Sequence, residues 1–170
     1  MKNSKLYDFV LTGLFVALIF VVTAYFPRIP TARGYIHVGD AVIYLAASVL
    51  PLPLSAIAAG LGGMFADVLT GYAIWAPYTL VIKACLTFAF TSKNGNLLCG
   101  RNVLATIMAF PITIGGYYLA ALLMTGNAIV PLAEIPANAV QSAGSLAIYI
   151  SFATCMDKAK IRARFAGGTR

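Results

Sequence analysis

The sequence AVIYLAASVLPLPLSAIAAGLGGMFA, which runs from Ala41 to Ala66, contains no charged residue and decides how the chain is threaded. Its length allows one tilted transmembrane helix, since a bilayer span needs about 20 residues. However, Pro51 and Pro53 lie in its middle. Each proline removes a backbone donor and together they favour a turn. We therefore predict two antiparallel helices joined by a tight hairpin at this point.

The composition places these helices in a membrane. Hydrophobic residues make up 61% of the chain, charged residues make up 10%, and the mean hydropathy is +0.87. These values lie far outside the mixture of soluble globular proteins. A chain of 170 residues holds about six spans and leaves no room for a soluble catalytic or nucleotide-binding domain. We predict an all-α integral membrane protein that forms one transmembrane domain over residues 1–170.

The positions of the basic residues predict the topology. The formal net charge is +7, but the cations lie at the ends of apolar runs and not on a clustered basic face. This argues against nucleic-acid binding and follows the positive-inside rule. Five helices would put the basic N-terminus and the basic C-terminal tail on opposite sides, whereas six put them on one side. We predict a bundle of six transmembrane helices with both termini cytoplasmic, at residues 6–26, 38–50, 54–70, 76–92, 102–124 and 136–157.

Three ionisable residues, Asp40, Asp67 and Lys83, fall inside or beside these apolar segments. An ionisable side chain at bilayer depth is costly and marks a functional site or a buried ion pair. Lys83 lies about two turns into the fourth predicted helix. We expect it to pair with Asp67 or Asp40, or to hold an acceptor on a ligand. The structural pair is favoured, because a buried cation without a partner is strongly destabilising.

The outward loops at 27–37, 71–75 and 125–135, with the helix ends beside them, hold most of the remaining unusual polar and aromatic residues. We expect these side chains to converge on one pocket. An aromatic wall with a few placed hydrogen-bonding groups suits a small planar ring ligand. The candidate substrate-binding residues are Tyr35, His37, Asp40, Asp67, Trp75, Tyr78, Lys83, Tyr117, Asn138 and Gln141.

Structural explanations compete with this hypothesis. Trp75, Tyr72 and Tyr78 equally fit an interfacial aromatic belt. His37 fits an exposed loop position, and Asp40 fits a residue that complements a helix dipole. Because His37 is the only histidine and the three cysteines are isolated, we expect no metal site. No catalytic motif is evident, so we expect no catalytic residues.

Small residues form two tracks at helical spacing. Gly13 and Ala17 form one on the first predicted helix, and Ala58, Gly62 and Ala66 form another on the third. Such tracks let helices approach closely in lipid. They are compatible with internal packing and with docking onto another protein.

Three blocks of sequence resemble the substrate-binding S components of energy-coupling factor (ECF) vitamin transporters. The blocks are YIHVGDAVIYLAA at 35–47, GLGGMFAD at 60–67 and WAPYTLVIK at 75–83. Their nearest likeness is to the subgroup for hydroxymethylpyrimidine, pyridoxine and related small vitamins. In the second half of the chain, only Asn138 to Gln141 matches the family pattern.

The resemblance implies a non-catalytic subunit of an ECF-type ABC transporter in a bacterial cell membrane. Such a subunit binds a vitamin or precursor from outside and delivers it inward with a transmembrane coupling subunit and two ATPase subunits. It binds no cofactor, and ATP is used by its partners. Gly13 and Ala17 occupy the place where the first helix of the family meets the coupling subunit.

Other functions stay open. The vitamin is hydroxymethylpyrimidine or pyridoxine in the first hypothesis, and riboflavin or another vitamin in the alternative. A self-sufficient proton-coupled carrier, with Asp40 or Asp67 as the titrating group, is a further hypothesis. The lack of an inverted repeat counts against such a carrier. A membrane-embedded enzyme is a weaker hypothesis still.

Overall fold

Six α-helices follow one another along residues 4–30 and 35–160, the part of the chain that the computed structural model describes. Two short strands pair antiparallel between the first and second helices, with Ile29 opposite Ile36. A 3₁₀-helix precedes the last helix. The elements are α1 (Ser4–Tyr25), β1 (Ile29–Pro30), β2 (Tyr35–Ile36), α2 (Gly39–Val49), α3 (Leu52–Leu69), α4 (Ala76–Leu86), α5 (Gly100–Thr125), η1 (Val130–Glu134) and α6 (Ile135–Lys158).

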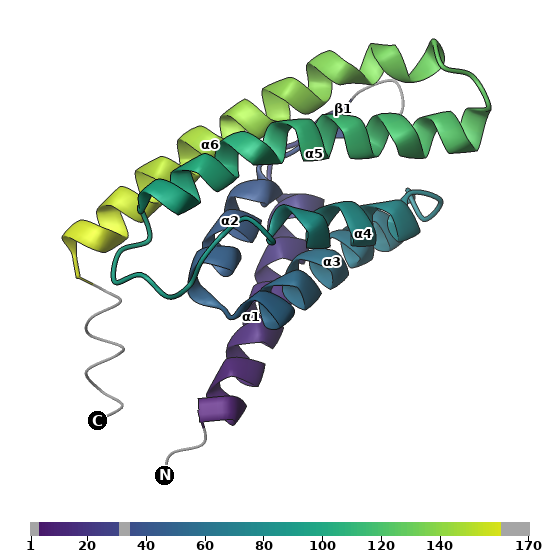
Figure 1. The fold of residues 1–170 in the computed structure, drawn as a ribbon. Helices are drawn as coiled ribbons and strands as arrows, with labels where there is room; N and C mark the ends of the chain where they lie inside the picture. Colours follow the sequence, from purple (N-terminus) through teal and green to yellow (C-terminus); the bar gives the residue numbers. More distant parts are fainter. Residues whose placement is uncertain (1–3, 31–34, 161–170) are drawn as a thin grey trace.

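The helices form two groups. Figure 1 shows α5 and α6 side by side as an antiparallel pair, with α1–α4 below them. Within the lower group α1 packs against α3 and α3 packs against α4. Contacts of α2 with α6, and of α4 with α5, join the two groups. The start of α1 and the end of α6 lie on the same side of Figure 1 as the loop 87–99, which we call the basal end. The α3–α4 and α5–η1 turns lie at the opposite, distal end.

The turn predicted at the two prolines is confirmed. Leu50 and Pro51 are extended, with ψ angles of 150° and 147°, and α3 begins at Leu52 with a proline in its first two positions. The N–H of Leu50 closes α2 by donating to the carbonyl of Ala46 (2.8 Å), and the N–H of Ser55 opens α3 by donating to the carbonyl of Pro51 (2.9 Å). The chain therefore reverses where proline removes backbone donors.

Among the described residues, four helices are long and apolar enough to span a membrane: α1, α3, α5 and the segment containing η1 and α6. The other two, α2 and α4, are apolar but have 11 residues each. At 1.5 Å per residue each is about 16 Å long, roughly half the thickness of a hydrocarbon core. An all-α membrane fold therefore agrees with the structure, while six complete crossings and cytoplasmic termini stay predictions.

The fourth helix ends earlier than predicted, at Leu86 and not near residue 92. The N–H of Thr87 donates to the carbonyl of Ala84 (3.1 Å) and that of Phe88 to the carbonyl of Cys85 (3.3 Å), so the last turn tightens to three-residue spacing. The backbone of Thr91 is then held by the side chain of Asn102, which accepts from its N–H (2.8 Å) and donates to its carbonyl (3.0 Å). This tertiary contact leads the chain away from the helix, and apolar periodicity does not reveal it.

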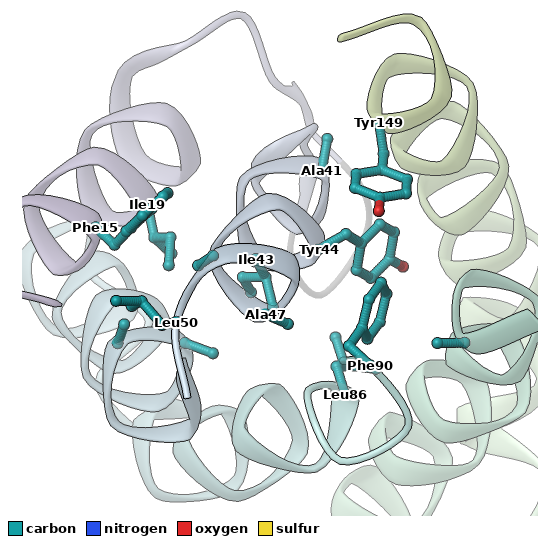
Figure 2. Packing of buried hydrophobic residues seen from close by; sticks show 14 of the residues in the cluster. Phe15, Ile19, Ala41, Ile43, Tyr44, Ala47, Leu50, Leu86, Phe90 and Tyr149 are labelled. Atoms are coloured by element: carbon teal, nitrogen blue, oxygen red, sulfur yellow. The ribbon is translucent and has the colours of Figure 1, made fainter. Parts of the chain in front are cut away.

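Side chains from α5 and α6 fix the basal loop 87–99. The carboxylate of Asp157 accepts hydrogen bonds from the backbone N–H groups of Leu97 (2.8 Å) and Leu98 (2.9 Å). The hydroxyl of Tyr149 donates to the carbonyl of Leu97 (3.0 Å). An aromatic cluster lies beside this clamp: Tyr44 stacks on Phe90 with ring centroids 5.4 Å apart, and Tyr149 meets both rings edge-on (Figure 2). The core is thus tied directly to the basal loop.

The two predicted tracks of small residues differ in their surroundings. A Cβ added at Gly62 would lie 2.7 Å from the side chain of Ile19, so the track on α3 lets α1 approach closely. In contrast, a Cβ at Gly13 would meet nothing within 4 Å, and both Gly13 and Ala17 are exposed. The α3 track therefore packs the interior, whereas the α1 pair lies on the outer surface of the bundle.

We predict that Gly62→Val lowers the thermal unfolding temperature of the purified protein, whereas Gly13→Val leaves it unchanged. Overpacking of the α1–α3 contact should cost about 1–3 kcal/mol. Thermal unfolding of both variants in detergent checks this expectation. Equal stability of the two variants would contradict the close approach of α1 and α3.

Candidate functional site

A buried ion pair joins the first turn of α2 to the last turn of α4. The Nζ atom of Lys83 lies 2.6 Å from Oδ1 of Asp40, and their side chains are 1% and 0% exposed. Of the partners predicted for Lys83, the structure selects Asp40. Because each charge would be strongly destabilising here without the other, the pair fixes the relative position of the two short helices.

Gln141 extends this pair to α6. Its Nε2 donates to Oδ2 of Asp40 (3.0 Å), and its Oε1 accepts from the backbone N–H of His37 (3.3 Å). Both oxygens of the Asp40 carboxylate are therefore engaged, one by a cation and one by an amide. A single glutamine connects the acidic residue with the loop that enters α2.

His37 is buried rather than exposed in its loop. Its Nδ1 accepts a hydrogen bond from the N–H of Gly39 (3.0 Å). Burial lowers the pKa of His37 to about 4, with Lys83 acting in the same direction and Asp40 opposing it. The ring is therefore neutral at pH 7, and its proton lies on Nε2 because Nδ1 is an acceptor.

Aromatic side chains flank the ion pair on the α4–α5 side. The Nζ atom of Lys83 lies 5.2 Å from the centroid of the Tyr117 ring, a cation–π distance. The hydroxyl of Tyr117 lies 3.2 Å from Oγ1 of Thr79, and its ring lies 6.1 Å from that of Trp75 at 57°. Both aromatic rings are half-buried. The structure therefore brings Trp75 and Tyr117 together beside the ion pair, and their role in ligand binding stays a prediction.

Asp67 brings α3 into the same cluster. Its side chain is buried, and it interacts electrostatically with Lys83 and Tyr117. One turn before it, a Cβ at Gly63 would lie 3.0 Å from the side chains of both Lys83 and Thr79. A glycine here therefore lets α4 approach α3 closely enough to place Lys83 in the bundle. We refer to Asp40, Lys83, Gln141, His37, Asp67, Thr79, Tyr117 and Trp75 as the distal polar cluster.

The remaining predicted residues are less closely connected. Asn138 lies one turn before Gln141 on α6 and is half-buried. Tyr78 is also half-buried. The side chain of Tyr35 lies outside the described part of the structure. Of the adjacent pair Tyr117 and Tyr118, only Tyr117 joins the cluster, because the Tyr118 hydroxyl donates to the carbonyl of Ala128 in the α5–η1 loop (3.0 Å).

Groups that could hold a metal are not evident. Within residues 4–30 and 35–160, no three His, Cys, Asp or Glu side chains gather at one place. The cluster instead offers two carboxylates, one of them paired with a lysine, together with an amide, a neutral imidazole and two aromatic rings. Such a set can recognise a small ligand by hydrogen bonding and ring stacking.

Comparison with known proteins identifies the family. A family model described as "ECF-type riboflavin transporter, S component" matches residues 3–158. The chain belongs to this family. S components are transporter subunits, and the apolar helices agree with a multi-pass membrane protein. The likeness to S components that the three sequence blocks indicate is thereby confirmed, while the hydroxymethylpyrimidine and pyridoxine subgroup stays a prediction.

One relative is similar over part of its length. This S component is similar to a protein from Pyrococcus woesei described as "Uncharacterized protein in gap 3'region". The two are 35% identical over 100 residues, which cover 58% of this chain and 66% of the relative. The match therefore spans just under two thirds of the length of that protein.

The sequence hypothesis missed one member of the distal polar cluster. Thr79 lies four residues before Lys83 on α4, so the two share a helix face. This four-residue spacing was the one feature of the sequence that could have indicated Thr79 as a neighbour of Lys83. The contact of its hydroxyl with Tyr117 depends on how α5 packs on α4, which the sequence of α4 does not encode alone.

Removing one charge of the ion pair should destabilise this S component. We predict that Asp40→Asn lowers its thermal unfolding temperature, because Lys83 then lacks an anionic partner at a cost of about 3–5 kcal/mol. The double variant Asp40→Asn with Lys83→Met should recover part of the loss, since both charges are gone. Thermal unfolding of single and double variants measures this coupling. Strictly additive losses would show that the two side chains do not depend on each other.

Proposed function

We propose that this S component captures a small vitamin with a planar heteroaromatic ring from outside the cell and delivers it inward with ATP-driven partners. The observation that carries the proposal is the distal polar cluster. It places paired charges from the first turn of α2 and the last turn of α4, with an amide from α6, beside two half-buried aromatic rings. Such a combination recognises the edge and the face of a ring at the same time.

Riboflavin is the first candidate ligand, because the matching family is described by that vitamin. Hydroxymethylpyrimidine and pyridoxine are the second candidates, since the sequence blocks at 35–47, 60–67 and 75–83 resemble that subgroup. Each of the three contains a nitrogen heterocycle whose edge can form hydrogen bonds with an amide side chain. The ring should lie against Trp75 and Tyr117, with its polar edge toward Asn138 and Gln141.

The membrane arrangement belongs to the same proposal. The distal end faces the outside of a bacterial cell membrane, and the basal end, where α1 starts and α6 ends, faces the cytoplasm. This assignment places the cluster where a vitamin arrives. It also places the basic residues Lys93, Arg101 and Lys158 on the cytoplasmic side, as the positive-inside rule expects.

Ligand binding tests the capture step. We predict saturable binding of one of the three vitamins to the purified protein, and a roughly tenfold loss of affinity in Asn138→Ala, the scale of one hydrogen bond. This variant should fold normally, because Asn138 is only half-buried and the bond that completes the Asp40 carboxylate comes from Gln141. Gln141→Ala should lose at least as much affinity. Fluorescence or calorimetric titration measures each dissociation constant.

Asn96→Ala is the matched control, since it removes an exposed amide from the basal loop. It should bind like the wild type. Unchanged affinity in both Asn138→Ala and Gln141→Ala would remove these amides from the site. Absence of binding for all three vitamins would contradict the proposed ligand class.

The partners of this chain are part of the proposal as well. We expect a transmembrane coupling subunit that packs against Gly13 and Ala17 on α1, and two ATPase subunits that hydrolyse ATP. The small pair suits this role because it is exposed and a Cβ at Gly13 would meet nothing of the chain itself within 4 Å. Close helix approach in lipid needs such small residues.

Bulky substitution of the α1 pair should therefore uncouple transport from binding. We predict that Gly13→Leu or Ala17→Leu abolishes ATP-dependent vitamin uptake in cells with the partner subunits, while ligand affinity and thermal stability are unchanged. Ala147→Leu, at an exposed position of α6, serves as a control. Loss of binding together with uptake would mean that the pair supports the bundle itself. Uptake driven by a pH gradient in vesicles containing this chain alone would favour a self-sufficient carrier instead.

A further inference from the structure

Exposed cations gather at the basal end of the bundle. The start of α5, the loop 87–99 and the end of α6 with the two residues after it lie together there (Figure 1). Each of these three segments contributes at least one basic side chain that is exposed. We refer to these residues as the basal cation patch: Lys93, Arg101, Lys158 and Lys160. The patch therefore combines segments that are far apart in the sequence.

The acidic residues of the chain do not balance this patch. Of the five acidic residues in the sequence, Asp40 and Asp67 belong to the distal polar cluster and Glu134 lies on η1 at the distal end. Asp8 lies on α1. Asp157 is the carboxylate beside the patch, and both of its oxygens accept backbone N–H groups of the loop (2.8 and 2.9 Å). A surplus of positive charge therefore stays where α5, α6 and the loop meet.

The backbone that carries the patch is held in place. The Nε atom of Arg101 donates to the carbonyl of Ala89 (3.0 Å). Next to it, Asn102 bonds both backbone groups of Thr91, and the N–H of Lys93 donates to Oγ1 of Thr91 (3.3 Å). A guanidinium carries several N–H donors, so this one contact orients the group without using all of them. The loop therefore presents its cations from a fixed backbone.

Exposed apolar side chains lie on the same helices, distal to the patch. On α5, Leu104 and Met108 follow Arg101 along one helix face and are 58% and 48% exposed. On α6, Phe152 is 62% exposed and lies roughly 9 Å before Lys158 along the helix axis. A charged region that continues into an apolar surface suits an amphiphile. A soluble anion or a cytosolic protein would leave the apolar part of this surface unused.

We infer that the basal cation patch binds the headgroup of an anionic phospholipid, whose acyl chains lie along the exposed apolar side chains of α5 and α6. Basic residues at the cytoplasmic ends of transmembrane helices attract anionic lipids, and basic pockets between such helices bind their headgroups. The guanidinium of Arg101 offers the fork geometry that a phosphate accepts, and Lys93 and Lys158 add positive charge beside it. The assignment to the cytoplasmic leaflet rests on the proposed orientation of this S component, whereas the lipid site itself does not.

Competition between two lipids tests the inference on the purified protein in detergent micelles. Native mass spectrometry should show phosphatidylglycerol retained roughly fivefold or more over phosphatidylcholine when both are added at equal concentration. Arg101→Gln and Lys158→Gln should each weaken phosphatidylglycerol binding by about fivefold, the contribution of one cation near a membrane surface. Arg101→Lys keeps the charge but loses the Nε contact with Ala89, so its affinity should fall between those of the wild type and Arg101→Gln.

Lys5→Gln is the matched control, because Lys5 is an exposed lysine in the first turn of α1, at the basal end but outside the patch. It should bind phosphatidylglycerol like the wild type. Equal losses in Lys5→Gln and Lys158→Gln would show a diffuse effect of charge and would overturn the site. Thermal unfolding of each variant without added lipid separates loss of fold from loss of lipid binding.

Other occupants of the patch are separate outcomes. Equal retention of the two lipids would overturn the inference. Displacement of phosphatidylglycerol by an equal concentration of glycerol phosphate would also overturn it, since this soluble phosphate has no acyl chain. If Lys158→Gln loses its co-purifying partner subunits while the wild type shows no lipid selectivity, the patch contacts an acidic protein surface and the lipid site is wrong.

Vitamin titration keeps this inference apart from the proposed function. Arg101→Gln should bind a vitamin like the wild type, because the patch lies at the opposite end of the bundle from the distal polar cluster. Loss of lipid selectivity would leave vitamin capture intact. Failure of every vitamin to bind would contradict the proposed function and leave the lipid site intact.

Discussion

The ion pair between Asp40 and Lys83 is the constraint on which the arrangement of the bundle depends. Two charges in an apolar interior are tolerated only as a close pair whose remaining hydrogen-bonding positions are filled. The pair therefore requires α2 and α4 to meet at one depth, and it requires Gln141 of α6 to complete the carboxylate. A glycine at position 63 gives the lysine stem room against α3. One interaction thus sets the positions of four helices.

The basal half of the bundle is organised differently. There Asp157, Asn102 and Tyr149 bond the backbone of the loop 87–99, and the aromatic cluster of Tyr44, Phe90 and Tyr149 fills the space beside it. These contacts satisfy the backbone of an irregular segment at the end of the bundle, where unpaired polar groups would be costly. These contacts hold the basal half in place. The polar and aromatic side chains of the distal cluster can then bind a ligand at one end, while other surfaces contact partner subunits.

Much of the fold could be predicted because it follows from local chemistry. The charge-free stretch around Pro51 and Pro53 predicted the α2–α3 turn, and the cost of a buried cation predicted that Lys83 has an acidic partner. The end of α4 could not be predicted, because a side chain of α5, Asn102, holds the chain beyond it. The choice of Asp40 over Asp67 and the burial of His37 likewise depend on how separate helices pack.

The proposed function follows from where polar groups are concentrated in the bundle. The chain belongs to the family of S components of ECF-type riboflavin transporters, and its described part gathers charges, amides and aromatic rings at the distal end. The most direct measurement is an experimental structure of the purified protein with its bound vitamin. We predict a ring against Trp75 and Tyr117, with a polar edge within hydrogen-bonding distance of Gln141. A ligand bound away from these residues, with the distal polar cluster unchanged, would contradict it.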